Sequence, residues 1–340
     1  MHEEIFNQIS STFFLPKKTL IVFPDYIGDS VLLTPFLRNF RYNLSKGAIV
    51  HVCANTPIAK MLQGNPHLDM IFAKDKIRDI PGFLKRQKYD TALILDFSLS
   101  WSFHICKAKK IQQKVITDMK RANVRMHKFL GGFFNHVLET TTIEDKKPQI
   151  DVYLSYLKQL GLKVYDRYLE VKVDFNDVKN AQKLIKSNHK RKVFLHLGAS
   201  IYSKQWKNSY WKQIVEHLCD DDIYIIGSEI PSDELLASNV TDLCGKTNLK
   251  GTIALLKNAD ILITTDSAPA HLGAVAKVPK IIVLYGPTNN HQWKPYAPSS
   301  DVVQLYADVP CRPCNWRMCK GLKCIKELRP SYVINAIESI

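Results

Sequence analysis

Short runs of consecutive apolar residues alternate along this chain with longer segments in which apolar residues recur every three or four positions. The short runs are typical of strands buried in a parallel sheet, and the longer segments are typical of amphipathic helices that cover such a sheet. This alternation occurs once in each half of the chain. The sequence therefore predicts two α/β units, each built from a parallel sheet and crossover helices.

The pattern assigns the predicted elements to residue ranges. In the first half, strands are expected at 19–23, 49–54, 70–73, 91–95 and 114–117, and helices at 30–43, 77–86 and 148–160. In the second half, strands are expected at 193–196, 223–226, 261–264, 280–284 and 302–305, and helices at 209–219, 249–257, 268–276 and, closing the chain, 331–340. The weakly patterned segment 161–177 is the expected connection between an N-terminal domain at 1–165 and a C-terminal domain at 176–340.

Composition narrows the class of protein. A chain of 340 residues of which 46% are hydrophobic is not disordered and is long enough for two domains. It has no run of the roughly 18 to 20 apolar residues that a spanning helix needs, and its first residues lack the pattern of a secretory signal, so we expect a cytoplasmic protein. Its eight cysteines are then expected to be reduced thiols or metal ligands.

The excess of positive charge is concentrated in one segment. The formal net charge is +15, and residues 101–130 contain eight Lys or Arg and one acidic residue. Such a segment favours a phosphate-bearing partner, namely nucleic acid, acidic lipid or a phosphorylated glycan, although a solvated basic surface explains it equally well. The candidate anion-binding residues are Lys107, Lys110, Lys120, Arg121 and Arg125.

Gly28 and Asp29 lie where the first predicted strand is followed by a helix. In an open α/β sheet, ligands bind at this carboxyl edge of the strands. The three-glycine pattern of a dinucleotide-binding turn is absent, because only Gly28 is present, which disfavours a nicotinamide or flavin enzyme. From this motif alone, Asp29 is either a general base or a helix cap.

A second candidate loop, 197–206, follows the predicted strand that ends at position 196. Ser200 and the loop backbone can donate hydrogen bonds to a phosphate, and Lys204 can neutralise its charge. An ordinary loop with a surface lysine is the alternative interpretation. The nearby Trp206 and Trp211 are expected to pack in the core.

The third candidate follows the predicted strand 261–264. Asp266 or Ser267 is expected to cap the next helix, in which Pro269 occupies the first turn, and the free N–H groups of such a helix start suit a diphosphate. Ser267 and His271 are four residues apart and share one helix face. The loop 285–288 repeats the arrangement after the next strand, so two adjacent polar loops outline a pocket.

Four cysteines lie within 14 residues near the end of the chain: Cys311, Cys314, Cys319 and Cys324. Four thiols can form a tetrahedral structural site for zinc or iron. Reduced thiols or oxidised pairs are the alternatives. The other four cysteines, Cys53, Cys106, Cys219 and Cys244, are expected to be small buried apolar residues.

These motifs, in this order, resemble glycosyltransferase family 9, the ADP-heptose:lipopolysaccharide heptosyltransferases of the GT-B fold. The resemblance covers nearly the whole chain and includes IGDSVLLTP, HLGAS followed by KQW, GKTNL, LLKNADILITTDSAPAHLGA, YGPTNNHQWKPY and the cysteine-rich tail. It implies an α/β architecture of two Rossmann-like domains that face each other across a cleft. It also implies roles for seven residues: catalytic base for Asp29, diphosphate contacts for Ser200 and Lys204, and nucleotide-sugar contacts for Asp266, Ser267, Ala268 and His271.

The resemblance further implies an inverting, metal-independent transfer of a heptose or related sugar from an ADP-sugar, with no cofactor required for catalysis. The N-terminal domain would bind a phosphorylated lipopolysaccharide-core acceptor, which suits the basic segment, and the C-terminal domain would bind the donor. The lipid-linked acceptor would bring the enzyme to the cytoplasmic face of the inner membrane as a peripheral protein, and no nucleic acid is expected as a partner.

Two positions depart from the family pattern. The chain has Pro24 and Asp25 where a basic residue often precedes the glycine turn, and Ala268 where glycine is common. The acceptor and the donor sugar therefore stay open. Three alternatives also stay open: a glycosyltransferase of this fold that uses another nucleotide sugar, a sugar-nucleotide binder without activity, and a basic nucleic-acid-binding protein.

Overall fold

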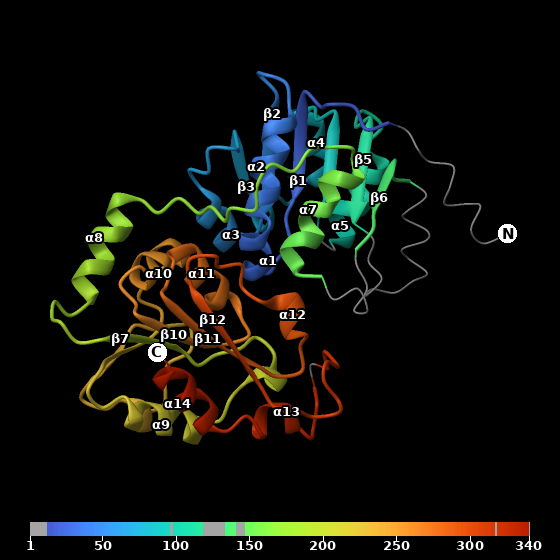
Figure 1. Cartoon of the computed structure of the whole chain (residues 1–340). Coiled ribbons are helices and arrows are strands. Elements are labelled where there is room, and N and C mark those ends of the chain that lie inside the picture. Colours follow the sequence, from blue (N-terminus) through green and yellow to red (C-terminus); the bar gives the residue numbers. More distant parts are fainter. Residues whose placement is uncertain (1–11, 96–97, 118–132, 141–146, 317, 340) are drawn as a thin grey trace. The chain divides into compact units, whose positions relative to one another are not determined.

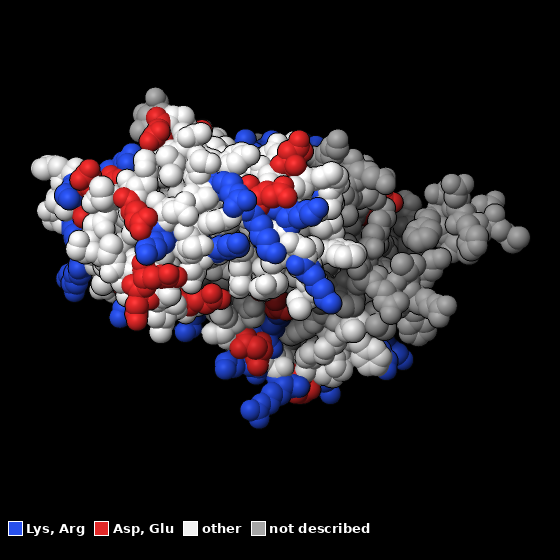
Figure 2. All heavy atoms as spheres, turned by 90° about the horizontal axis from the view of Figure 1, so that it is seen from below, with Lys and Arg blue, Asp and Glu red and all other residues white. Residues whose placement is uncertain are grey.

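The computed structural model describes residues 12–95, 98–117, 133–140, 147–316 and 318–339. The chain divides into two compact units, Met1–Lys172 and Val173–Ile340, and each is described by itself. Among the described residues, no helix has both the length and the hydrophobicity that a membrane span needs. On the face shown in Figure 2, Lys and Arg side chains are interspersed with Asp and Glu side chains.

The first unit contains a six-stranded parallel sheet in the order β3-β2-β1-β4-β5-β6 (Figure 1). Its strands are β1 (Lys18–Val22), β2 (Ile49–Ala54), β3 (Met70–Ala73), β4 (Thr91–Ile94), β5 (Gln113–Thr117) and β6 (His136–Leu138). Its helices are α1 (Ile27–Leu32), α2 (Thr34–Asn43), α3 (Thr56–Leu62), η2 (Lys74–Lys76), α4 (Ile80–Gln87), α5 (Leu99–Lys107) and α7 (Gln149–Gln159).

The second unit contains another six-stranded parallel sheet, in the order β12-β11-β10-β7-β8-β9. Its strands are β7 (Lys192–His196), β8 (Asp222–Ile225), β9 (Val240–Asp242), β10 (Ile261–Thr265), β11 (Lys280–Tyr285) and β12 (Asp301–Tyr306). Its helices are α8 (Phe175–Leu184), η4 (Tyr202–Lys204), α9 (Asn208–His217), η5 (Asp233–Leu235), α10 (Leu249–Leu256), α11 (Ala268–Ala276), α12 (Asn290–Trp293), α13 (Lys323–Lys326) and α14 (Pro330–Glu338).

Both sheets have the same strand order. Counted from the first strand of each unit, the order is 3-2-1-4-5-6, which is the doubly wound Rossmann arrangement. The order reverses between β1 and β4 in the first unit and between β7 and β10 in the second. Ligands of such sheets bind at the carboxyl ends of the strands beside this reversal. The loops that follow β1, β7 and β10 are therefore the places where the fold predisposes each unit to bind.

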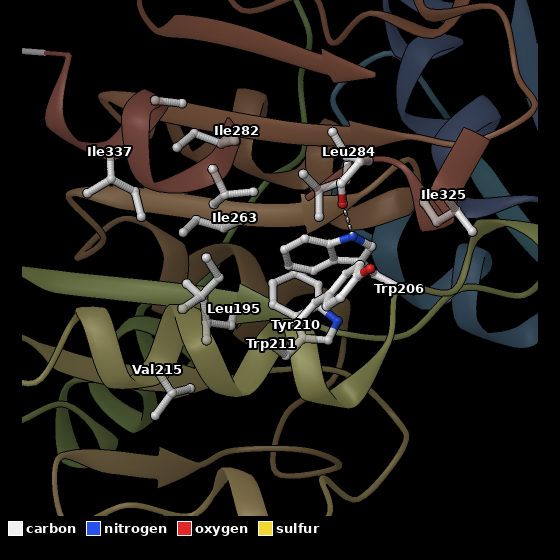
Figure 3. Packing of buried hydrophobic residues seen from close by; sticks show 14 of the residues in the cluster. Leu195, Trp206, Tyr210, Trp211, Val215, Ile263, Ile282, Leu284, Ile325 and Ile337 are labelled. Carbon is white, nitrogen blue, oxygen red and sulfur yellow. Dashed lines mark hydrogen bonds between the residues drawn. The ribbon is translucent and has the colours of Figure 1, made fainter. Parts of the chain in front are cut away.

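Trp206, at the end of the second candidate loop, and Trp211, on α9, both lie in the core of the second unit. The rings of Trp206 and Trp211 are buried among aliphatic side chains from β7, β10 and β11 (Figure 3). Trp206 also donates a hydrogen bond from Nε1 to the carbonyl of Leu328 at 2.8 Å. Trp211 Nε1, in contrast, has no hydrogen-bond partner among the described residues. Buried indoles of this kind supply a large apolar contact area. The expected packing role of both residues is confirmed.

The ten predicted strands are confirmed, but β6 and β9 were not predicted. Other differences lie in the helices. The helix expected at 30–43 is two helices, because Pro35 lies in the first turn of α2 and a proline does not continue a helix from the preceding turn. Helix α8 begins inside the segment that was expected to be a connection. It buries only Ala181, and its Phe175 is 78% exposed. Apolar residues do recur every three positions in α8, at 175, 178, 181 and 184, so a helical pattern was present that begins in the segment assigned to the connection.

Candidate functional site

In the first unit, Asp29 lies at the carboxyl edge beside the strand reversal. It is the third residue of α1, is half-buried, and follows β1 by seven positions. The residue that caps α1 is Tyr26, so the interpretation of Asp29 as a helix cap is wrong. A carboxylate in the first turn is nevertheless favoured by the helix dipole. This position leaves the carboxylate available for chemistry at the sheet edge.

A tyrosine that sequence analysis missed holds this carboxylate. Tyr153, on α7, donates a hydrogen bond from its hydroxyl to Asp29 Oδ1. Tyr153 is buried, and burial, followed by the charge of Asp29 and by Tyr156, raises its pKa well above the usual value. The hydroxyl therefore stays protonated and acts as a donor. Because 124 residues separate the two positions, no local pattern could have connected them.

The loop before Asp29 is contacted by a lysine from another element, Lys74 of η2. Lys74 Nζ is 2.8 Å from Asp25 Oδ1 and donates a hydrogen bond to the carbonyl of Phe23 at 2.9 Å. Pro24 and Asp25 stand where the resemblance led us to expect a basic residue. The structure thus brings a positive charge to this loop from η2, although the sequence has an acidic residue there.

In the second unit, Lys204, Asp266 and Thr288 form one hydrogen-bonded triad. Lys204 Nζ is 2.7 Å from Asp266 Oδ2 and 3.1 Å from the carbonyl of Asp266. Thr288 donates a hydrogen bond from its hydroxyl to the same Oδ2 atom. The three residues follow β7, β10 and β11, which are neighbours in the sheet. Lys204 is therefore not an ordinary surface lysine, since its ammonium is fixed against a buried carboxylate.

The side chains at the start of α11 do not cap it. Asp266 is engaged by Lys204 and Thr288, and the N-terminal cap Ser267 makes no side-chain capping bond. Ser267 Oγ instead lies 3.2 Å from His196 Nδ1, and Thr264 Oγ1 lies 3.3 Å from the same nitrogen. Ser267 is the N-terminal cap residue of α11, as one of the two expectations had it, although its side chain does not make the capping bond, and Asp266 is not the cap. Pro269 has no N–H group and the N–H of Ala270 donates to the Ser267 carbonyl at 3.1 Å, so the first turn offers at most the N–H of Ala268 to an anion.

His271 is a buried histidine on α11, and one of its ring nitrogens, Nδ1, lacks a hydrogen-bond partner among the described residues. Burial lowers its pKa to about 4, against a smaller opposing effect of Asp266, so the ring is neutral at physiological pH. Burial likewise lowers the pKa of His196 to about 4. A buried polar atom without a partner is costly, and a ligand that supplies the partner removes this cost.

The remaining predicted donor residues lie nearby in the chain but outside the triad. Ser200 is exposed in the loop after β7, and no hydrogen bond from it to the triad is present in the described part of the chain. That loop is tied to β10, because Thr265 donates a hydrogen bond to the carbonyl of Gly198 at 2.6 Å. Ala268 is the first residue of α11 and is half-buried.

The basic segment is described only in part. Lys120, Arg121 and Arg125 lie outside the described residues. Lys107 and Lys110 are exposed, and Lys107 Nζ lies 4.0 Å from the centroid of the Phe103 ring. At least these two lysines belong to the solvated surface of the first unit.

The cysteines near the end of the chain are free thiols of different exposure. Cys311 is exposed, Cys314 and Cys319 are half-buried, and Cys324 is buried. Within the ranges that the structure describes, no group of three or more His, Cys, Asp or Glu is placed to hold a metal ion. Burial, followed by the neighbouring Cys311 and Cys314, raises the pKa of the Cys324 thiol, so these cysteines lie near one another. The zinc or iron site stays a prediction from their spacing. Cys219 is exposed as well, so its expected burial is wrong.

Solved structures show the same architecture. The chain resembles a family 9 glycosyltransferase of Veillonella parvula, with a TM-score of 0.75, 22% identity and coverage of 95% of this chain and 96% of that chain. It also resembles the ADP-heptose lps heptosyltransferase II of Escherichia coli, with a TM-score of 0.71, 16% identity and coverage of 95% and 98%. These similarities confirm the expected GT-B class of fold, built from two Rossmann-like units.

Sequence comparison identifies the family. The chain is 25% identical over 342 residues to lipooligosaccharide heptosyltransferase 2 of Campylobacter jejuni subsp. jejuni serotype O:2, which covers 95% of this chain and 98% of that protein. The model of glycosyltransferase family 9 (heptosyltransferase) matches residues 82–325, and the chain therefore belongs to this family. The expected resemblance and the enzyme class, a glycosyltransferase, are confirmed.

Proposed function

We propose that this enzyme transfers a heptose, with inversion, from ADP-heptose to a lipopolysaccharide-core acceptor. The observation that carries the proposal is the triad of Lys204, Asp266 and Thr288 beside the start of α11, at the strand reversal of the second unit. A fixed ammonium and the positive end of the helix dipole suit the diphosphate of a nucleotide sugar. The names of the relatives support heptose as the sugar and ADP as the nucleotide.

In the proposed reaction, the Asp29 carboxylate removes the proton of an acceptor hydroxyl. The hydroxyl oxygen attacks the anomeric carbon of the donor, a new glycosidic bond forms, and the bond from that carbon to the ADP oxygen breaks. The hydrogen bond from Tyr153 supports this role, because it fixes the orientation of the carboxylate.

Negative charge develops on the departing diphosphate, and the second unit supplies positive charge for it. Lys204 and the start of α11 are already oriented before the donor binds, so they stabilise the leaving group without reorganisation. Ser200, Ser267, Ala268 and His271 complete the proposed donor site, in which the unpaired Nδ1 of His271 takes a partner from the nucleotide sugar. We infer that these groups perform the transfer without a metal ion or cofactor.

The test is calorimetric titration of the purified protein with ADP, UDP and GDP, followed by a turnover assay with ADP-heptose and a heptose-deficient core acceptor. We expect ADP to bind most tightly and the product to carry the inverted configuration. Tighter binding of UDP or GDP would contradict the donor nucleotide. If no nucleotide binds, while duplex DNA binds with a steep salt dependence, the proposal fails in favour of the nucleic-acid alternative.

We also propose a peripheral position on the cytoplasmic face of the inner membrane, where the lipid-linked acceptor lies. On α5, Leu99 and Phe103 are 40% and 45% exposed, and the exposed Lys107 follows four residues later. Exposed apolar side chains next to lysines are suited to an anionic lipid surface.

Sedimentation with phosphatidylcholine vesicles, with and without phosphatidylglycerol, tests this position. Phe103→Glu should reduce the fraction bound to the anionic vesicles, whereas Phe175→Glu, an exposed phenylalanine of the second unit, is the matched control. Equal binding of both variants would contradict a role for α5.

A further inference from the structure

We propose that the start of the cysteine-rich segment, residues 311–316, positions the donor site, and that Arg312 is its principal positioning residue. This inference rests on the proposed donor site and concerns residues that lie outside it. The argument depends on contacts between this segment, the loop 286–288 and the turn that carries Lys204, all within the second unit.

Arg312 binds the loop that carries Thr288. Its Nε donates a hydrogen bond to the carbonyl of Gly286 at 2.6 Å, and its Nη2 donates one to the carbonyl of Thr288 at 3.2 Å. The guanidinium also lies over the Tyr306 ring, 4.6 Å from the centroid. The planar fork of an arginine fixes two acceptors in one geometry, which a lysine does not do.

The backbone of the same segment donates hydrogen bonds to the remaining carbonyl of the loop, that of Pro287. The N–H groups of Cys314 and Asn315 both donate to the carbonyl of Pro287 at 3.0 Å. All three carbonyls of the loop 286–288 therefore accept hydrogen bonds from residues 312–315. The conformation of the loop, and with it the direction of the Thr288 hydroxyl, is set by a segment that lies 24 to 28 positions further along the chain.

The segment also binds the turn that carries Lys204, the other donor to Asp266. Ser203 donates a hydrogen bond from Oγ to the carbonyl of Trp316 at 2.6 Å, and Ser203 directly precedes Lys204. The turn and the loop are in close contact, because a Cβ atom on Gly286 would lie 2.8 Å from the Ser203 carbonyl oxygen and 3.6 Å from Lys204 Cα. The positions of both donors to Asp266, Lys204 and Thr288, therefore depend on contacts with the one segment 311–316, which we call the clamp.

Loss of the clamp should disturb the donor site more than the fold. The direct test is Arg312→Lys, which keeps the positive charge and removes the fork. Its matched control is Arg329→Lys, because Arg329 likewise binds a tyrosine, with Nη1 donating to Tyr210 Oη at 2.6 Å and the guanidinium 5.8 Å from that ring. Arg329 makes no contact with the loop 286–288 among the described interactions.

We expect Arg312→Lys to weaken ADP binding and to raise the donor KM by about tenfold, the effect of losing one well-placed hydrogen bond. Its melting temperature should fall no further than that of Arg329→Lys. Equal ADP affinity and equal donor KM in the two variants would overturn the inference. If the unmodified protein binds no ADP, the proposed function itself has failed, so the two failures are distinguishable.

A milder variant covers the case in which Arg312→Lys does not fold. Tyr306→Leu removes the aromatic face below the guanidinium and leaves both hydrogen bonds in place. We expect ADP affinity to fall by about two- to fivefold, the usual effect of a cation–π contact at a partly exposed site. Unchanged affinity in this folded variant would contradict the clamp.

Discussion

Asp29 in the first unit and Asp266 in the second unit occupy related places, since each follows a strand that borders the reversal of its sheet. Their surroundings differ. Asp29 is half-buried and accepts a hydrogen bond from the neutral Tyr153 hydroxyl, whereas Asp266 is buried and accepts bonds from the Lys204 ammonium and from Thr288. The Asp266 carboxylate is thus held by a cation, whereas the Asp29 carboxylate is held by a neutral hydroxyl. The proposed function assigns a proton acceptor to this position in the first unit and a charge anchor to it in the second.

The largest expected effect is on catalysis at Asp29. Asp29→Asn should lower kcat by about 10²- to 10⁴-fold, the usual contribution of a general base, and should leave the ADP Kd and the melting temperature unchanged. Asp25→Asn, in the same loop, is the control, because Asp25 is exposed and Lys74 keeps its hydrogen bond to the Phe23 carbonyl after the change. A normal kcat in Asp29→Asn would remove the distinction between the two carboxylates.

The next effect is on stability and concerns Asp266. Lys204→Met should lower the free energy of unfolding by about 3 to 5 kcal/mol, because it leaves a buried carboxylate without its cation. Urea unfolding measures this loss. Lys250→Met is the control, since the partner of Lys250, Asp174, is largely exposed and stays hydrated after the change. Losses of equal size would show that Asp266 is not specially dependent on Lys204.

The third prediction concerns how the free energy of unfolding depends on pH, and it tests the burial of His271 in the proposed donor site. Burial lowers the pKa of His271 to about 4, below the value of about 6.5 in an unfolded chain, so protonation favours unfolding. The associated stability is complete above about pH 6.5 and should decrease by about 3 kcal/mol as the pH falls to about 4. His196 acts in the same direction. Urea unfolding at several pH values should show a smaller decrease for His271→Gln, and an identical decrease would contradict the buried state of this ring.

The smallest effect concerns Tyr153. Tyr153→Phe removes one hydrogen bond to the Asp29 carboxylate, and we expect kcat to fall about tenfold, as for one bond to a charged group. Donor affinity should not change, because the variant leaves the second unit intact. Steady-state kinetics and ADP titration on the same preparation separate the two quantities. A change in ADP affinity without a change in kcat would place the effect of Tyr153 elsewhere.

The sheets and the positions of the candidate loops could be predicted because they depend on local patterns. A buried strand is a continuous apolar run, and the carboxyl ends of parallel strands meet at one edge, so the loop after strand 261–264 and the loop 285–288 were expected to outline one pocket. The role of Thr288 was not predicted. These inferences needed only the order of the elements.

Other features could not be predicted because they depend on packing between distant segments. No spacing in the sequence relates Tyr153 to Asp29, or Arg312 to the carbonyls of Gly286 and Thr288. The cap assignment was only partly right for the same reason, since Asp266 binds Lys204 of η4 and Ser267 Oγ lies 3.2 Å from Nδ1 of His196 on β7 instead of binding the N–H groups of their own helix.

The pairing of β7 with β10 has a consequence for how the donor site comes into being. In the sheet register Val193 lies opposite Ile261, 68 positions apart in the chain, and β8, β9 and α10 lie between them in sequence. Such long-range pairing forms late, after the entropy of closing a long loop has been overcome. We therefore expect that a truncated chain ending before β10 does not bind a nucleotide. During refolding of the full chain, nucleotide binding should appear at the same rate as native tertiary structure.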